Sequence, residues 1–159
     1  MTTKQSNLLC ELFLQDHKDF TRKLNCLVEQ LDQGSLAAAK RTAFELDVLA
    51  GPHVAFEEEV LYPVTGKAQG TPFQTRLLRE HDQTQAGLVR LLSANEDELN
   101  DPGFVKAVAD ALRKGLEHAE SCGTLVSHLG MLSKEEESKA AQRFKELKEE
   151  ERRWTELPR

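Results

Sequence analysis

Hydrophobic positions recur along this chain with the period of an α-helix. The first apolar stripe, at spacings of three and four residues, predicts a helix over about residues 7–33. Its members are Cys10, Phe13, Leu14, His17, Phe20, Leu24, Leu27, Val28 and Leu31. Because no segment shows a convincing period of two, the pattern predicts an all-α fold.

A second helix is predicted from the Gly34-Ser35 turn to about Leu61. Pro52 is expected to kink this helix, because proline removes a backbone donor and clashes with the preceding turn. The Tyr62-Pro63 pair is expected to end it. The inner face of the helix carries Ala43, Leu46, Leu49, His53, Glu57 and Val60.

Three further helices are predicted from their capping signals. Thr71-Pro72 opens one that runs to about Asn95, and Asp101-Pro102 opens the next. Their inner faces hold Leu77, Leu78, His81, Gln85, Leu88 and Leu92 in the first, and Ala107, Val108, Ala111, His118, Cys122, Leu125 and Leu129 in the second. A Ser133-x-x-Glu136 capping box opens the last, strongly charged helix. This helix would lie across the others or form a dimer contact through a thin apolar stripe of Ala140, Phe144, Leu147 and, at its end, Trp154.

The composition is that of one globular domain. With 159 residues, 39% hydrophobic and 30% charged, we predict a single domain over residues 1–159, with a bundle at about 7–132 and a C-terminal helix at about 133–154. A net charge of -6 without a basic face argues against nucleic acid or membrane as a partner. No signal peptide, bilayer-spanning run or disulfide pattern is recognisable, so a cytoplasmic location is expected.

Four histidines form two near-copies of one pattern. Asp16-His17 and His53-x-x-x-Glu57 make the first copy, and Glu80-His81 and His118-x-x-x-Cys122 make the second. One histidine on an apolar helix face is usually a core or surface residue. Four at matching positions each need a buried partner, and a metal supplies all of these partners at once. The repeat therefore predicts an internally duplicated chain with a site for two metals.

This ordered set of motifs resembles that of the hemerythrin-like, or HHE cation-binding, proteins. Their signature has a histidine on helices one and three, His-x-x-x-Glu on helices two and four, and a Leu-Phe-Pro-like ending on helix two, matched here by Leu61-Tyr62-Pro63. The resemblance covers about residues 7–132. It implies an up-down four-helix bundle with a non-haem di-iron centre in its core.

Carried over by the resemblance, His17 and His53 would ligate one metal, His81 and His118 the other, and Glu57 would bridge them. The metal could also be zinc, because imidazole with one carboxylate suits zinc as well as iron. Ferritin-like carboxylate sites use Glu-x-x-His, and no histidine here has a glutamate three residues before it.

Two departures from the family pattern fall on the second half of the site. Gln85 stands where oxygen-carrying members have a further histidine, so this ligand position is expected to be vacant. Cys122 replaces the helix-four carboxylate and admits three interpretations: a small buried apolar residue, a thiolate ligand or a redox thiol. Both changes argue against reversible oxygen carriage.

Five other residues near the motifs are given lesser roles. Glu58 is interpreted as a helix-face charge or a support for a ligand. Asp16, Glu80 and Glu117 each precede a histidine and are expected to be solvated, unless relaxed geometry recruits one of them to the site. His128 is expected to be structural or exposed.

The function expected is that of a small protein that binds non-haem iron and a small ligand such as O2, NO or peroxide, as a sensor, scavenger or weak oxidase, with binding favoured over catalysis. The alternative is a helical bundle whose site has decayed to one zinc or no metal, acting as an interaction or structural protein or a homodimer. Neither a glycine-rich phosphate loop nor a Gly-x-Ser-x-Gly elbow is present, which argues against kinase and hydrolase functions.

Overall fold

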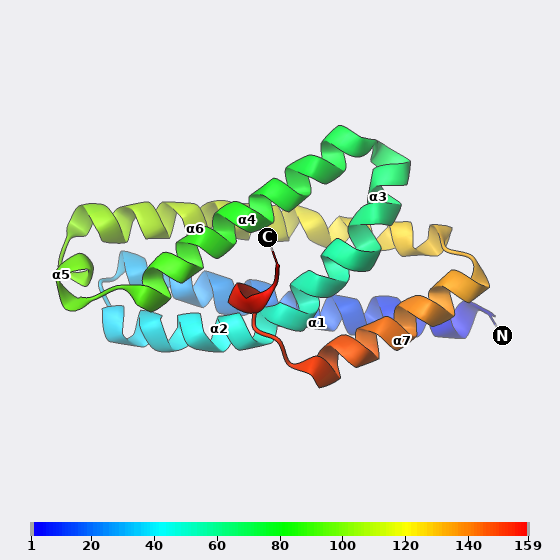
Figure 1. Cartoon of the computed structure of the whole chain (residues 1–159), viewed down its shortest axis with the longest axis horizontal. Helices are drawn as coiled ribbons and strands as arrows, with labels where there is room; N and C mark the ends of the chain where they lie inside the picture. Colours follow the sequence, from blue (N-terminus) through cyan, green and yellow to red (C-terminus); the bar gives the residue numbers. More distant parts are fainter. Residues whose placement is uncertain (1, 159) are drawn as a thin grey trace.

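The amphipathic segments fold as antiparallel helix pairs in a computed structural model, which describes residues 2–158 and the side chains from Leu8 onward. Four long helices build the bundle: α1 (Thr2–Asp32), α2 (Leu36–Phe56), α4 (Thr71–Ser93) and α6 (Pro102–Cys122). They run up and down in turn, with α4 crossing the others obliquely (Figure 1). No strand occurs between residues 2 and 158. The all-α bundle predicted from the sequence is confirmed. Met1 and Arg159, at the ends of the predicted domain, lie outside the described residues.

Shorter elements connect and extend these helices. They are the π-helix η1 (Glu57–Leu61), α3 (Tyr62–Gln69), α5 (Glu96–Leu99), the 3-10 helix η2 (Gly123–Met131), α7 (Lys134–Glu150) and the 3-10 helix η3 (Trp154–Glu156). α5 was not predicted, and the fourth predicted helix continues as η2 rather than as a regular α-helix. None of the described helices has the length and apolar character needed to cross a bilayer.

The predicted capping residues behave in two ways. The side chain of Asp101 accepts a hydrogen bond from the Gly103 N–H at the start of α6, and Ser133 and Glu136 form the predicted capping box of α7. The prediction that Thr71 caps α4 was wrong. Gly70 is the N-cap and makes no side-chain cap; its φ of 97° turns the chain between α3 and α4, a conformation that glycine adopts without steric cost.

The second predicted helix does not end at Tyr62-Pro63, and this prediction was wrong. α2 runs through Pro52, and the chain stays helical through η1 and α3 to Gln69. In η1 the Tyr62 N–H donates to the Glu57 carbonyl, five residues earlier. A π turn loosens the i→i−4 ladder, so the ring of Pro63 is accommodated there.

The core lies between the four long helices, where most of the predicted inner positions are buried. On α1, Phe13, Phe20 and Leu24 are buried. Two predicted inner positions are exposed instead. Leu14 lies at the margin of its stripe and lines an open surface cleft, and Ala107 lies in the second turn of α6, facing outward.

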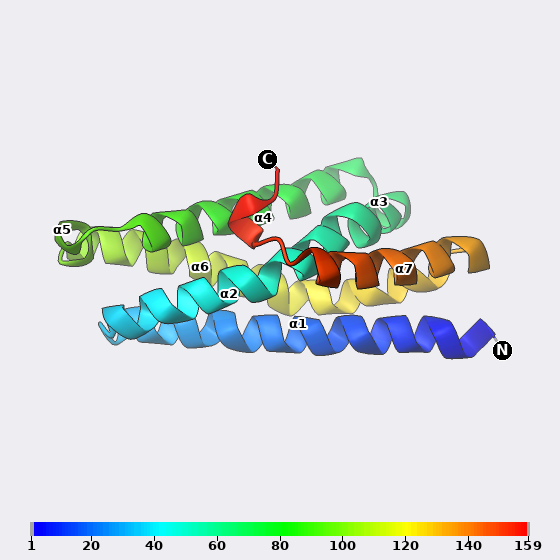
Figure 2. The same cartoon turned by 60° about the horizontal axis from the view of Figure 1, so that its bottom comes forward.

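α7 packs against α1 and α2 of the bundle (Figure 2). Phe144 is buried in α7 and meets Phe56 edge to face, with ring centroids 5.2 Å apart. Arg143 forms two hydrogen bonds with Glu59 in η1. Of the two placements predicted for this helix, the position across the bundle is therefore the one observed, and the apolar stripe of α7 is covered within the chain.

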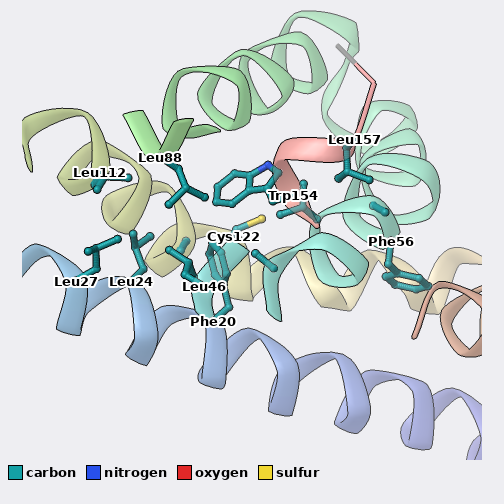
Figure 3. Close-up of a cluster of buried hydrophobic side chains, with 14 of the residues drawn as sticks. Phe20, Leu24, Leu27, Leu46, Phe56, Leu88, Leu112, Cys122, Trp154 and Leu157 are labelled. Atoms are coloured by element: carbon teal, nitrogen blue, oxygen red, sulfur yellow. The ribbon is translucent and has the colours of Figure 1, made fainter. Parts of the chain in front are cut away.

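The segment that follows α7 folds back between α2 and α4 and delivers Trp154 to the core (Figure 3). The Trp154 ring is 1% exposed and packs edge-on against Phe20, with centroids 5.8 Å apart. Asp47 on α2 accepts hydrogen bonds of 2.8 Å from both the N–H and the hydroxyl of Thr155. A Cβ on Gly51 would come within 1.7 Å of the Arg152 carbonyl oxygen, so only glycine admits this segment.

Candidate metal centre

The four repeated histidines converge in the middle of the bundle, one from each long helix. All four are buried, as is Glu57 at the start of η1. Two groups of candidate ligand atoms form, His17 with His53 and Glu57, and Glu57 with His81 and His118, and within each group the atoms lie within 4.8 Å of one another. Glu57 belongs to both groups.

The first half-site consists of His17, His53 and Glu57. The Nε2–H of His17 donates a 2.6 Å hydrogen bond to the Ala119 carbonyl, which leaves the Nδ1 lone pair of His17 facing inward. Nδ1 of His17 lies 3.2 Å from Nε2 of His53, and that Nε2 lies 2.8 Å from Oε1 of Glu57. The three candidate ligand atoms of this half-site therefore lie close together.

Aromatic stacking holds the ring of His53. The ring lies between Phe13 and Phe20, with centroids 5.0 Å and 5.5 Å away. Nδ1 of His53 has no hydrogen-bond partner among the described residues. Its orientation is thus fixed by packing against two phenylalanines rather than by a carboxylate.

Two carboxylates orient the histidines of the second half-site. Nδ1 of His81 lies 3.0 Å from Oε1 of Glu58, and Nδ1 of His118 contacts Oε2 of Glu80. Both Nε2 atoms then face inward, which is the usual arrangement of histidines that bind metals. Glu58 supports a candidate ligand, His81, which is one of the two roles predicted for it. Glu80 was expected to be solvated unless relaxed geometry recruited it, and it is recruited, because it reaches from α4 to a histidine on α6.

Tyr62 is the residue of the site that the sequence reasoning missed. Its hydroxyl donates a 2.9 Å hydrogen bond to Oε2 of Glu57 and lies 2.8 Å from Nε2 of His81 and 2.9 Å from Nε2 of His118. In a regular α-helix, positions five apart are separated by about 140°. The π turn of η1 brings Tyr62 onto the face of Glu57. The available signal was a tyrosine in the position of the family's Leu-Phe-Pro-like ending.

Cys122 and Gln85, the two departures from the family pattern, are both buried and hydrogen-bonded within the protein. Sγ of Cys122 donates to Oε2 of Glu57 at 3.0 Å and lies 3.3 Å from the Tyr62 hydroxyl. The side-chain amide of Gln85 donates a 2.7 Å hydrogen bond to the Trp154 carbonyl. The ligand position at Gln85, which was expected to be vacant, therefore has its side chain hydrogen-bonded to the C-terminal segment.

The electrostatics favour the ionised form of the Glu57 carboxylate and the neutral forms of His17 and His118. Burial alone would raise the pKa of Glu57, but the neighbouring imidazoles, His53 foremost, hold it well below its usual value. Burial lowers the pKa of His17 against the opposing effect of Glu57, and burial together with His81 lowers the pKa of His118. Burial and the charge of Glu57 raise the pKa of the Cys122 thiol and of the Tyr62 hydroxyl.

These shifts predict that protein stripped of metal by a chelator loses stability as the pH falls from about 7.5 to 5. Because the folded pKa values of His17 and His118 lie below the unfolded value of about 6.5, the unfolded chain binds more protons in this range, and acid favours unfolding. Glu57 stays ionised here, and its own contribution is lost only as the pH falls through its lowered pKa. Urea midpoints at several pH values test this. A midpoint that is flat or rises toward pH 5 would contradict it.

Surface clefts border histidines of both half-sites. A cleft of about 460 Å³ between α1 and α6 has His17 in its wall, together with Lys18 and Gly123. Another, of about 400 Å³, reaches His118 and Glu80. A small molecule could therefore approach either half-site, whereas the rings around His53 shield the interior.

Two residues noted in the sequence lie outside the centre. His128 is half-buried, and its Nδ1 lies 3.0 Å from the Thr65 hydroxyl, which fits its predicted structural role. Glu117 is exposed on α6, in line with the expectation that it is solvated.

The donor atoms fit a cation. Imidazole nitrogens and a carboxylate are ligands of iron and of zinc, and here they lie within 4.8 Å of one another in each group, inside a buried core. Residues 9–121 match the family described as Hemerythrin: Hemerythrin HHE cation binding domain. Searches of curated proteins and of solved structures found no match to this chain.

Proposed function

The chain belongs to the hemerythrin HHE cation-binding family, and on this premise we propose that it binds two non-haem iron ions and, through them, a small ligand such as O2, NO or peroxide. A role as a sensor or scavenger is favoured over one as an oxidase. From the sequence we also propose that the protein is cytoplasmic and forms a homodimer.

The position of Glu57 is the observation that carries the proposal. Its Oε1 lies 2.8 Å from Nε2 of His53, while its Oε2 lies 3.9 Å from Nε2 of His81. The two oxygens therefore face histidines of different half-sites. A carboxylate with this placement is suited to join two cations, and its ionised form is already favoured by the surrounding imidazoles.

The chain's own residues would set the conditions at the centre. Bound iron would supply open coordination positions and redox chemistry. Glu58 and Glu80 contact the outer nitrogens of His81 and His118 and so turn the inner nitrogens toward the centre, and Phe13 and Phe20 exclude water from around His53. The clefts at His17 and His118 are the routes by which a diatomic ligand or peroxide would enter.

The second candidate is a centre that holds one zinc or no metal. The side chain of Gln85 favours it, because its amide is directed to the Trp154 carbonyl. Cys122 favours it as well, because a carboxylate is missing there. In that case the first half-site would retain the single ion, and the bundle would act as an interaction or structural protein.

Loading with ferrous iron without oxygen, followed by metal analysis, tests the proposal. We expect near two irons per chain and a change in the visible spectrum when NO, O2 or peroxide is added. Parallel loading with zinc should give no visible absorption and serves as the control. A ratio near zero would exclude iron binding, and one zinc that iron cannot displace would favour the second candidate.

A further inference from the structure

The hydroxyl of Tyr62 lies among the donor atoms of the second half-site. Within 2.9 Å of the hydroxyl oxygen are Nε2 of His81, Nε2 of His118 and Oε2 of Glu57. Tyr62 is fully buried, so bulk water does not compete for these contacts. A hydroxyl in this place interacts with the same three atoms that would hold a metal.

Around the Tyr62 hydroxyl there are fewer protons than lone pairs that need one. In neutral imidazoles, the contacts of Nδ1 with Glu58 and Glu80 place the single proton on Nδ1 and leave Nε2 as an acceptor. The hydroxyl has one proton, which it donates to Glu57. Two imidazole lone pairs then face the phenol oxygen without a proton between them. Buried acceptors without donors are costly, and a cation at this place would remove that cost.

We propose, resting on the proposed function that a metal binds here, that Tyr62 is a ligand of the second half-site and that its phenolate oxygen replaces the carboxylate missing at Cys122. On metal binding the O–H bond of Tyr62 breaks, the oxygen keeps the electron pair, and the proton leaves to solvent. No residue is oxidised or reduced in this step. The second half-site then has two nitrogen and two oxygen ligands from His81, His118, Glu57 and Tyr62.

Cys122 is the competing candidate, and the geometry favours Tyr62. Sγ of Cys122 does not belong to either group of His, Cys, Asp and Glu donor atoms that meet within 4.8 Å in the described residues. Its hydrogen bond is to Glu57, whereas the Tyr62 oxygen touches both histidines of the half-site as well. Sγ therefore lies beside the candidate ligand atoms of the second half-site, and the phenol oxygen lies among them.

Spectroscopy of the ferric protein tests the inference, because Tyr62 is the chain's single tyrosine and any tyrosinate signal belongs to it. Full-length protein is loaded with ferrous iron, its metal content is measured, and the iron is oxidised with ferricyanide. We expect a visible charge-transfer band whose resonance Raman spectrum contains tyrosinate ring modes. Tyr62→Phe, which keeps the ring, should lose these modes and bind the second iron at least about tenfold more weakly, while the first iron remains.

The matched control is Cys122→Ser, which should keep the tyrosinate modes. A parent protein with two irons but no tyrosinate modes would overturn the inference, and so would a band that disappears in Cys122→Ser and persists in Tyr62→Phe. Circular dichroism of both variants establishes that the helices are intact. If the parent binds no iron, the proposed function and this inference fall together, and metal analysis before oxidation identifies that case.

Discussion

Glu57→Gln is expected to reduce bound metal from near two ions per chain to near zero. Glu57 is the residue shared by both groups of donor atoms, so its loss removes a ligand from each half-site at once. The glutamine amide is neutral and presents an N–H group where an oxygen lone pair is needed. Since changes in residues that only support metal ligands cost 10–100-fold in affinity, we expect a loss of more than about a hundredfold. Competition with a coloured chelator measures it.

The matched control for this variant is Glu59→Gln. Glu59 lies two residues further along η1, has the same charge and is exposed, where it pairs with Arg143. Loss of an exposed pair of this kind costs about 0–1 kcal/mol, and metal binding should be unchanged. If Glu57→Gln retained both ions with the affinity of the parent, Glu57 would not be a ligand of either metal.

Trp154→Ala is expected to destabilise chelator-treated protein by about 3–5 kcal/mol, the usual cost of truncating a buried aromatic residue. Trp154 is 1% exposed, and its ring contacts both Phe20 and His81, with centroids 5.8 Å and 6.1 Å away. Its loss would leave a cavity beside the second half-site. Urea unfolding followed by circular dichroism measures the effect, since the variant has no tryptophan to report by fluorescence.

Phe44→Ala provides the comparison for Trp154→Ala. Phe44 is a large aromatic residue on α2 that is 53% exposed, so its truncation should change stability by about 0.5 kcal/mol or less. Equal effects of the two substitutions, or a cost below about 1 kcal/mol for Trp154→Ala, would mean that the C-terminal segment is not part of the folded core.

The helices and the histidine cluster could be predicted from the sequence because both follow the regular α-helical period. His17 lies on the same stripe as Phe13 and Phe20, and His53 and Glu57 are four residues apart, so a period of 3.6 places each of them toward the core. Resemblance to a family then supplied the arrangement of the four helices around the centre.

The parts that were missed depend on departures from that period or on contacts between distant segments. Tyr62 reaches Glu57 through a π turn, which the hydrophobic pattern does not predict. Glu80 supports a histidine on another helix, 38 residues away. Trp154 lies in a short 3-10 turn after α7, and the position of that turn depends on the contact between Thr155 and Asp47, 108 residues apart. Such pairings are decided by tertiary packing, which local sequence does not encode.

Anomalous diffraction from a crystal of the iron-loaded protein, collected at the iron absorption edge, tests the two-metal centre most directly. We predict two peaks on either side of the Glu57 carboxylate, one beside His17 and His53 and the other beside His81 and His118. A single peak, or peaks away from Glu57, would contradict a two-metal centre that shares this carboxylate.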